Sequence, residues 1–192
     1  MARDPIQIFT RWFKQAQRAG IPLVEAVAFA TADRRGRPSV RFVLLKEVDQ
    51  HGFVVFTNAD SRKGRELAEN PYAALAVHWE PLGKQVRVEG RVEQIDAAAA
   101  DAYWKTRPRE SQLAALASRQ SVPIGSRDAL LARWKALARR YRDTDVPRSP
   151  NWTGFRIIPR AIEFWIHRDH RLHDRELFVR KGKSWRSLRL QP

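Results

Sequence analysis

Apolar residues recur along this 192-residue chain with two different periods, and each period predicts a different kind of element. Asp4-Pro5 is suited to cap and begin a helix. Behind it, apolar residues fall three or four positions apart and share one helical face before Gly20: Ile6, Phe9, Trp12, Phe13 and Ala16. Beyond position 25 the apolar runs become short and are bounded by turn residues, which is typical of strands.

These short runs predict an antiparallel meander followed by further strands. Turns are expected at 35–38, at Gly52 and at Lys181-Gly182. One run, 85–93, alternates apolar and polar residues with Gly90 on its apolar side, which indicates a half-buried strand with a bulge. The expected strands are 26–33, 40–46, 53–58, 73–79, 85–93, 154–158, 162–166, 176–180 and 184–190.

Helical signals interrupt the strands. Ser61 can cap a short helix that ends before Asn70-Pro71. Residues 143–150, rich in Asp and Pro, predict a loop rather than a domain boundary. Many strands with a few helices predict an α+β fold, an antiparallel split β-barrel with peripheral helices in a single domain, 1–192. The other expected helices are 97–106, 109–118 and 126–142.

Composition supports a folded core and narrows the choice of partners. Hydrophobic residues make up 43% of the chain, and without cysteine there are no disulfides or thiolate metal sites. No apolar run approaches the roughly 18 residues of a membrane span, and Met1 to Asp4 begin no signal peptide, so we expect a soluble, cytoplasmic protein. The net charge of +15 favours nucleic acid or phosphorylated small molecules, although solvated surface accounts for most of the 36 basic residues.

Three segments carry candidate anion-binding residues. Arg62 and Lys63 lie in the first turn of a predicted helix, where the helix dipole disfavours each cation by roughly 0.3–1 kcal/mol. A bound phosphate would make both cations favourable there, because they and the free backbone amides would all point at it. The alternative interpretation is an exposed first turn whose side chains are solvated. Lys46 shares a strand face with apolar residues, and either lines a ligand mouth or reaches out to water. Arg41 lies on the opposite face of that strand.

The third segment surrounds Arg107-Pro108-Arg109. Tyr103 lies one helical turn before Arg107 and Ser111 one turn after it, so the three side chains can face one ligand. Pro108 is able to start a helix between them.

The densest polar cluster is 167–175, with three histidines between arginines. Histidine and aspartate are metal ligands, but the arginines would repel a cation, so we predict no metal. A structural loop is one interpretation, and contact with an anionic ligand is the other. Trp165, just ahead of the cluster, is the tryptophan placed to touch a ligand. The sequence has no nucleophile elbow, Walker motif or paired acid–base carboxylates, which favours a bound cofactor that supplies the chemistry.

Taken together, the ordered segments resemble the pyridoxine/pyridoxamine 5'-phosphate oxidase family across nearly the whole chain. The matching segments are Asp4-Pro5, RFVLLK (41–46), FTN (56–58), SRK (61–63), KQV (84–86), RPRESQ (107–112), SRQS (118–121), IEFW (162–165) and RLHDR (171–175). The resemblance implies a split-barrel homodimer with flavin mononucleotide (FMN) between its subunits. Residues implied to contact FMN are Arg41, Lys46, Phe56, Thr57, Arg62, Lys63, Gln85, Gln120, Ser121, Trp165 and Arg175.

The resemblance also implies the reaction and the substrate residues. Pyridoxamine or pyridoxine 5'-phosphate would be oxidised to pyridoxal 5'-phosphate, with O2 as electron acceptor and hydrogen peroxide as product. Tyr103, Arg107 and Ser111 would hold the substrate phosphate, and the catalytic pair Arg171 and His173 would flank the ring opposite the flavin. Lys46 would contact the substrate as well as FMN.

Three departures from the family pattern concern this chain. Phe56 is often tyrosine in the family, so a hydroxyl contact is lost. Only three residues precede Asp4, so an arm that folds over the substrate in other members is expected to be missing or truncated. Before the first strand, family members often have an acidic residue followed by proline, whereas this chain has Leu23-Val24-Glu25.

Two alternatives to this function stay open. One is a related oxidase that acts on another ring, such as a phenazine precursor, and the other is a basic nucleic-acid-binding module.

Overall fold

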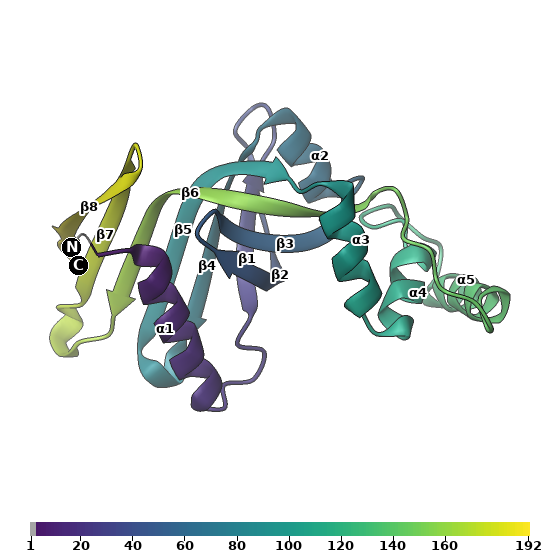
Figure 1. Cartoon of the computed structure of the whole chain (residues 1–192), viewed down its shortest axis with the longest axis horizontal. Helices are drawn as coiled ribbons and strands as arrows, with labels where there is room; N and C mark the ends of the chain where they lie inside the picture. The colour runs from purple at the N-terminus through teal and green to yellow at the C-terminus, as the bar shows by residue number, and fades with distance from the viewer. Residues whose placement is uncertain (1–2) are drawn as a thin grey trace.

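Six strands form a closed antiparallel barrel in the computed structural model, which describes residues 3–192 (Figure 1). Around the ring the order is β3-β2-β1-β4-β5-β6, and pairing of β3 with β6 closes it. Beyond β6 the sheet continues into β7 and β8, so β6 belongs to both parts. The bounds are β1 Ala26–Ala32, β2 Pro38–Asp49, β3 Gly52–Asn58, β4 Tyr72–Trp79, β5 Lys84–Gln94, β6 Trp152–Ile166, β7 Asp174–Lys181 and β8 Ser184–Leu190.

The first helix, α1 (Pro5–Arg18), packs its apolar face on the barrel core. Asp4 caps it by accepting a hydrogen bond from the Ile6 amide at 2.9 Å. Phe9 is fully buried and meets Phe53 and Trp79 with ring centroids 4.9 Å and 5.8 Å apart. Burial of such large rings stabilises the fold by roughly 1.5–3 kcal/mol each.

The remaining helices are α2 (Arg62–Glu69), α3 (Ala97–Thr106), α4 (Arg109–Ala117) and α5 (Arg127–Arg140). Figure 1 shows α3, α4 and α5 gathered at one end of the molecule, with β7 and β8 at the other. A second apolar cluster, which includes Trp104, Leu113 and Trp152, joins this helical end to β6. The fold thus confirms the predicted α+β barrel with peripheral helices. No helix within residues 3–192 is long and apolar enough to cross a membrane.

The prediction of separate strands at 154–158 and 162–166 is wrong, because β6 runs without a break from Trp152 to Ile166. Pro159, which lacks an N–H donor, lies between the two predicted strands. Instead the pairing shifts there: Gly90 faces Pro159 and Glu89 faces Ala161, which leaves Arg160 as the extra residue of a β-bulge. The predicted bulge at Gly90 is therefore present, with its extra residue on the partner strand.

Replacement of Gly90 by alanine is expected to reduce the free energy of unfolding by about 1–3 kcal/mol or more. A Cβ atom there would lie 2.1 Å from the Ile158 carbonyl oxygen and 2.8 Å from its carbon, and backbone atoms cannot turn away as a side chain can. Urea denaturation measures the change. Gly125→Ala is the control, because its Cβ would meet nothing within 4 Å. Equal stability of the two variants would contradict this account of the bulge.

Candidate functional site

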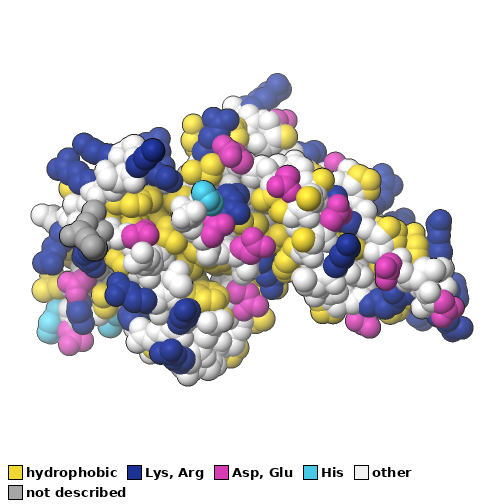
Figure 2. Space-filling model, viewed as in Figure 1, with side chains coloured by type: hydrophobic (Ala, Val, Ile, Leu, Met, Phe, Trp, Pro, Cys, Tyr) yellow, Lys and Arg dark blue, Asp and Glu magenta, His cyan; other side chains and the backbone are white. Residues whose placement is uncertain are grey.

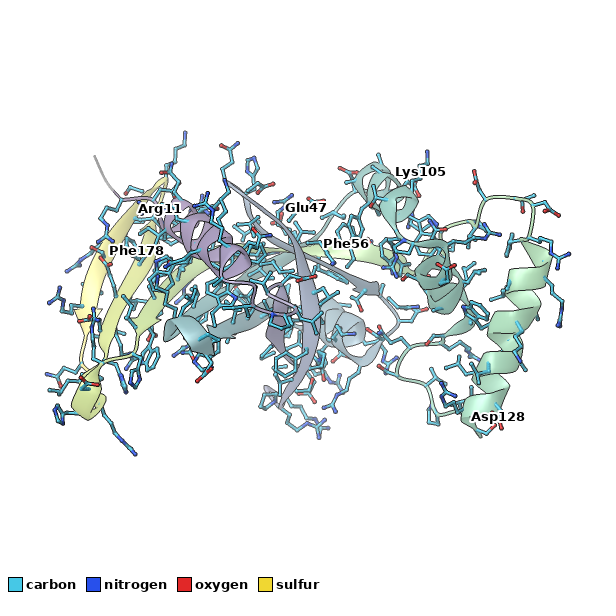
Figure 3. All side chains as sticks on the ribbon, turned by 90° about the horizontal axis from the view of Figure 1, so that it is seen from below. Arg11, Glu47, Phe56, Lys105, Asp128 and Phe178 are labelled. Atoms are coloured by element: carbon cyan, nitrogen blue, oxygen red, sulfur yellow. The ribbon has the colours of Figure 1, made fainter. Side chains whose placement is uncertain are left out.

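A groove of about 770 Å³ lies between strands β2 and β3 and the helical end of the molecule. Segments from four regions of the sequence meet in it. Figure 3 shows Phe56 between the barrel strands and the helical end of the molecule, which forms one wall of the groove. Of the site residues predicted from the sequence, those that line this groove are Arg41, Lys46, Phe56, Thr57, Arg62, Lys63, Tyr103, Arg107, Ser111, Gln120 and Ser121.

Lys63 occupies the polar end of the groove and is buried, with 6% of its surface exposed. Its Nζ donates to Thr57 Oγ1 at 2.9 Å, to Gln120 Oε1 at 3.1 Å and to Ser61 Oγ at 3.3 Å. All three partners are neutral. Burial and the nearby Arg41 guanidinium lower the pKa of Lys63 to about 8, which still leaves it mainly charged at neutral pH. A buried ammonium without a carboxylate partner is suited to an anionic ligand.

Arg41 and Arg62 flank Lys63 and share one carboxylate, that of Glu66. Arg62 Nε donates to Glu66 Oε1 at 2.8 Å, and Arg41 Nη2 lies 3.4 Å from Glu66 Oε2. Burial raises the pKa of Glu66, but hydrogen bonds from Ser39, Thr31 and Arg62 outweigh it and lower the pKa to about 2. The polar end thus holds three cations and one carboxylate.

The loop after α4 covers this end. Ser121 Oγ accepts from the Arg62 amide at 3.1 Å, and Thr57 Oγ1 donates to Gln120 Oε1 at 2.9 Å. Ser121 has a φ of 69°, a left-handed conformation that non-glycine residues seldom adopt outside sites that need it. The loop is thereby tied to both the start of α2 and the end of β3.

Tyr103, Arg107 and Ser111 also line the groove, on its helical side, but they do not share one helix. The spacing argument assumed continuous helical turns, whereas α3 ends at Thr106 and Arg107 is extended, with φ −74° and ψ 144°. Pro108 causes the break, since the residue before a proline is disfavoured in the α region. Arg107 bends back, and its Nη2 donates to the Ser111 carbonyl oxygen at 3.1 Å.

Aromatic rings surround the Arg107 guanidinium. It lies 4.7 Å from the ring centroid of Trp152, which is close enough for a cation–π contact. Tyr103 stacks on Phe56 with centroids 3.8 Å apart. Burial lowers the pKa of Arg107, and its Nε is buried without a hydrogen-bond partner among the described residues. An unpaired buried donor costs about 1–3 kcal/mol, which an anionic ligand would recover.

One wall of the groove is apolar and exposed. Val40, Phe42 and Leu44 project from β2 with 68%, 78% and 41% of their surfaces exposed. Lys46 follows them at a register shift between Leu45 and Glu47, and its Nζ lies 3.7 Å from Glu25 Oε1. Large apolar side chains exposed side by side indicate a surface that a ligand or another chain covers.

The other predicted site residues form a second cluster, far from this groove. Gln85, Trp165 and Arg175 are directly opposite one another on β5, β6 and β7, so their side chains share one face. His173 lies against Trp165, with ring centroids 4.5 Å apart. Arg171 is exposed in the loop between β6 and β7.

The 171–173 segment is not extended. Arg171 ends a short 3-10 helix, Asp169–Arg171, and both His170 (φ 58°) and Arg171 (φ 62°) are left-handed. Two such residues in succession are costly, roughly 1–3 kcal/mol each, and this backbone strain is a feature of functional loops. His173 Nδ1 accepts from the Arg168 amide at 3.2 Å, which fixes the ring.

The two clusters cannot meet within one chain. Trp152 lines the groove and Trp165 belongs to the second cluster, thirteen residues further along β6. At about 3.3 Å per residue the strand separates them by roughly 40 Å along its path. In Figure 3 Phe56 lies near the helical end, whereas Phe178 of β7 lies at the other end.

Several residues in the groove or behind its lining had escaped the sequence analysis. Glu66 was detectable, because it lies four positions after Arg62 on a helix, the spacing of an ion pair. Thr31 and Ser39 meet through the pairing of β1 with β2, and Trp152 reaches the groove only because pairing of β3 with β6 closes the barrel, so none of the three carried a local signal.

Comparisons with known families cover nearly all of the chain. A family model described as pyridoxamine 5'-phosphate oxidase matches residues 13–140. A second model, described as the pyridoxine 5'-phosphate oxidase C-terminal dimerisation region, matches residues 152–192. The boundary between the two matches falls in the 143–150 loop.

Individual relatives agree with the family models. Proteins named pyridoxine/pyridoxamine 5'-phosphate oxidase from Gluconobacter oxydans and Rubrobacter xylanophilus are 49% and 51% identical over 189 residues. Those alignments cover 98% of this chain and 94% and 87% of the relatives. Among solved structures, PhzG from Burkholderia lata 383 in complex with tetrahydrophenazine-1-carboxylic acid has a TM-score of 0.94 at 33% identity, covering 98% of this chain and 93% of that one. A pyridoxamine 5'-phosphate oxidase-related, FMN binding protein from Nostoc punctiforme shares the fold, with a TM-score of 0.79 at 17% identity, over the full length of both chains.

Proposed function

This chain belongs to the pyridoxamine 5'-phosphate oxidase family, and we propose that it is an FMN-dependent oxidase that converts pyridoxamine or pyridoxine 5'-phosphate to pyridoxal 5'-phosphate. Electrons would pass to O2, with hydrogen peroxide as product. The observation that carries the proposal is a groove lined by two sets of cationic side chains from different segments. Lys63 with Arg41 and Arg62 forms one set and Arg107 forms the other, as a phosphorylated cofactor and a phosphorylated substrate would require.

The polar end fits the phosphate of FMN in charge. Arg41, Arg62 and Lys63 with the single carboxylate of Glu66 leave a net charge of +2. A phosphate monoester carries about −1.5 to −2 near pH 7, so the two charges balance. Gln120 and Ser121 would close over the phosphate, since both already contact groups at this end.

Bound FMN would supply the redox chemistry, by taking a hydride from C4' of the substrate and reducing O2. The task of the protein is then binding and orientation. Phe56 and the exposed wall formed by Val40, Phe42 and Leu44 offer an apolar surface to a flat ring. Lys46, which lines the groove, would contact both cofactor and substrate.

Arg107, Tyr103 and Ser111 would bind the substrate phosphate. The buried Arg107 Nε has a hydrogen to donate, and the cation–π contact with Trp152 holds the guanidinium plane in place. Burial raises the pKa of Tyr103, which keeps its hydroxyl protonated as a donor.

The second cluster would complete the groove of a partner subunit. Arg171 and His173 would press the substrate ring toward the flavin, and Gln85, Trp165 and Arg175 would contact FMN. About 40 Å of strand separates them from the groove of their own chain, so we propose a homodimer with shared sites. The match of residues 152–192 to a dimerisation region and the exposed apolar wall of β2 support it. A single domain and a cytoplasmic location are also part of the proposal.

The phenazine alternative has a specific observation in its favour, the 33% identity and high structural similarity to PhzG. Relatives named for the B6 reaction are closer in sequence, at 49% and 51%. Arg107 and Ser111 also favour a phosphorylated substrate. The nucleic-acid alternative is weaker, because basic side chains are scattered over the face seen in Figure 2 and form no stripe there.

An aerobic assay of the purified protein tests the proposal. Pyridoxal phosphate, hydrogen peroxide and ammonia should form in equal amounts from pyridoxamine 5'-phosphate, because loss of a hydride and a proton leaves an imine that water hydrolyses to the aldehyde. Oxidation of a phenazine precursor without any turnover of the B6 phosphate would support the alternative instead.

The affinity of the flavin-free protein for FMN should fall at alkaline pH. Lys63 has a pKa of about 8 before the anion arrives, and an anion raises it. Below pH 8 the lysine is already charged, so binding takes up no proton there. Above pH 8 binding must take up one, and Kd should rise by up to about tenfold per pH unit. Quenching of flavin fluorescence between pH 7 and 10 measures this, with riboflavin, which lacks the phosphate, as control. An FMN Kd that stays constant over that range would show that Lys63 does not face the phosphate.

A further inference from the structure

We propose that Glu66 is a positioning residue that fixes Arg41 and Arg62 in the orientation needed to bind the cofactor phosphate. The inference rests on the proposed function, since it concerns the same groove. Glu66 lies on α2 with only 6% of its surface exposed, behind the cations that line the groove. It would act through these arginines and would not touch the ligand itself.

The two carboxylate oxygens of Glu66 serve different arginines. Oε1 accepts from Arg62 Nε at 2.8 Å, which leaves both terminal nitrogens of Arg62 for a ligand. Oε2 accepts from the hydroxyls of Thr31 at 2.5 Å and Ser39 at 2.6 Å, and lies 3.4 Å from Arg41 Nη2. One side chain on α2 thus ties together strands β1 and β2.

The hydroxyls that Glu66 holds also hold Arg41. Arg41 Nη1 donates to Thr31 Oγ1 at 2.6 Å and to the Phe29 carbonyl oxygen at 3.1 Å, and Nη2 donates to Ser39 Oγ. Each hydroxyl has a single hydrogen, which it donates to Glu66, so its lone pairs face Arg41. The carboxylate therefore sets the direction of the whole chain of hydrogen bonds.

An amide in place of the carboxylate cannot serve both arginines. Glutamine has one acceptor oxygen and one NH2 group, which only donates. If the oxygen faces Arg62, the NH2 group faces the hydroxyls and Arg41. If the amide is turned over, the NH2 group faces Arg62 Nε. In either orientation one arginine loses its anchor.

Positioning and simple electrostatics predict opposite results for Glu66→Gln. The substitution removes a negative charge near the phosphate, so electrostatics alone would make FMN bind more tightly. Loss of an anchored arginine would make FMN bind more weakly, by about tenfold or more, the equivalent of one charge-assisted hydrogen bond. The sign of the change therefore separates the two.

The experiment titrates flavin-free wild-type, Glu66→Gln and Glu69→Gln proteins with FMN and with riboflavin at pH 7. Glu69 is the matched control, because it is exposed on the same helix. We expect Glu66→Gln to raise the FMN Kd at least about tenfold, with riboflavin binding unchanged within about twofold. Glu69→Gln should match the wild type for both ligands. A thermal melt of each variant checks that it is folded.

An FMN Kd for Glu66→Gln that is unchanged or lower would overturn the inference and leave the proposed function standing. An equal loss for riboflavin would also overturn it, because the effect would not act through the phosphate. Wild-type protein that binds no FMN would instead refute the proposed function itself. If Glu66→Gln does not fold, Ser39→Ala decides, since it removes one hydroxyl between Glu66 and Arg41. Normal FMN affinity in that variant would overturn the inference.

Discussion

Protein in which both Arg62 and Lys63 are replaced by alanine is expected to be purified without flavin, whereas the unchanged protein should be yellow and should release FMN, not FAD, on denaturation. Each charge-assisted hydrogen bond to a phosphate contributes roughly 1.5–3 kcal/mol, so loss of two corresponds to about a hundredfold to ten-thousandfold in Kd. Lys63 has a further role, because its Nζ holds Thr57 and Gln120 together. Flavin absorbance after purification and fluorescence titration of the flavin-free protein measure the loss.

Arg65→Ala is the control for this double substitution. Arg65 lies on the same helix and is exposed, and its guanidinium donates to the Asp60 carbonyl oxygen, away from the groove residues. This variant should retain its flavin. If the Arg62 and Lys63 variant were equally yellow, the phosphate would lie elsewhere, and a colourless wild type that FMN cannot reconstitute would refute the flavin assignment.

The local elements of this fold were predictable because their signals are local. Asp4 and Ser61 cap helices where their side chains can reach a free amide, and Ser61 duly accepts from the Gly64 amide. Gly36, Gly52 and Gly182 occur at tight turns with positive φ, which other residues avoid. The bounds predicted for the helix 97–106 match those of α3, because an aspartate caps its start and Arg107-Pro108 ends it.

What could not be predicted depends on contacts between distant segments. The continuity of β6 through Pro159 requires the opposing bulge at Gly90, 69 positions earlier in the chain. Arg171 is left-handed because it ends a short 3-10 helix, and the sequence there contains no glycine or asparagine that would have indicated this conformation. The separation of the predicted site residues into two clusters follows from strand length, whereas the family resemblance had placed them around one cofactor without saying which chain supplies each.

Arg107 and Arg171 are expected to have different roles in catalysis. Arg107→Ala should mainly raise KM, by roughly 10- to 100-fold, because a phosphate contact is equally strong in the ground and transition states. Arg171→Ala should lower kcat as well, by up to roughly 100-fold, if it orients the reacting carbon toward the flavin as we propose. FMN content should be normal in both variants. Steady-state kinetics with pyridoxamine 5'-phosphate measure both effects, and an unchanged KM in Arg107→Ala would favour a substrate without a phosphate.

The largest effect is expected when these two variants are combined in one dimer. A heterodimer with Arg107→Ala in one subunit and Arg171→Ala in the other has one site with both arginines and one with neither, if each groove is completed by the partner. Its kcat/KM should recover to about half that of the wild type, because twofold symmetry repeats the site twice. Co-expression with two affinity tags isolates the heterodimer. If Arg107 and Arg171 served the same site from the same chain, each site would keep one substitution, and the heterodimer would remain as poor as its parents. Recovery therefore tests directly whether the strand that carries Trp165 away from its own groove delivers it to the groove of the partner subunit.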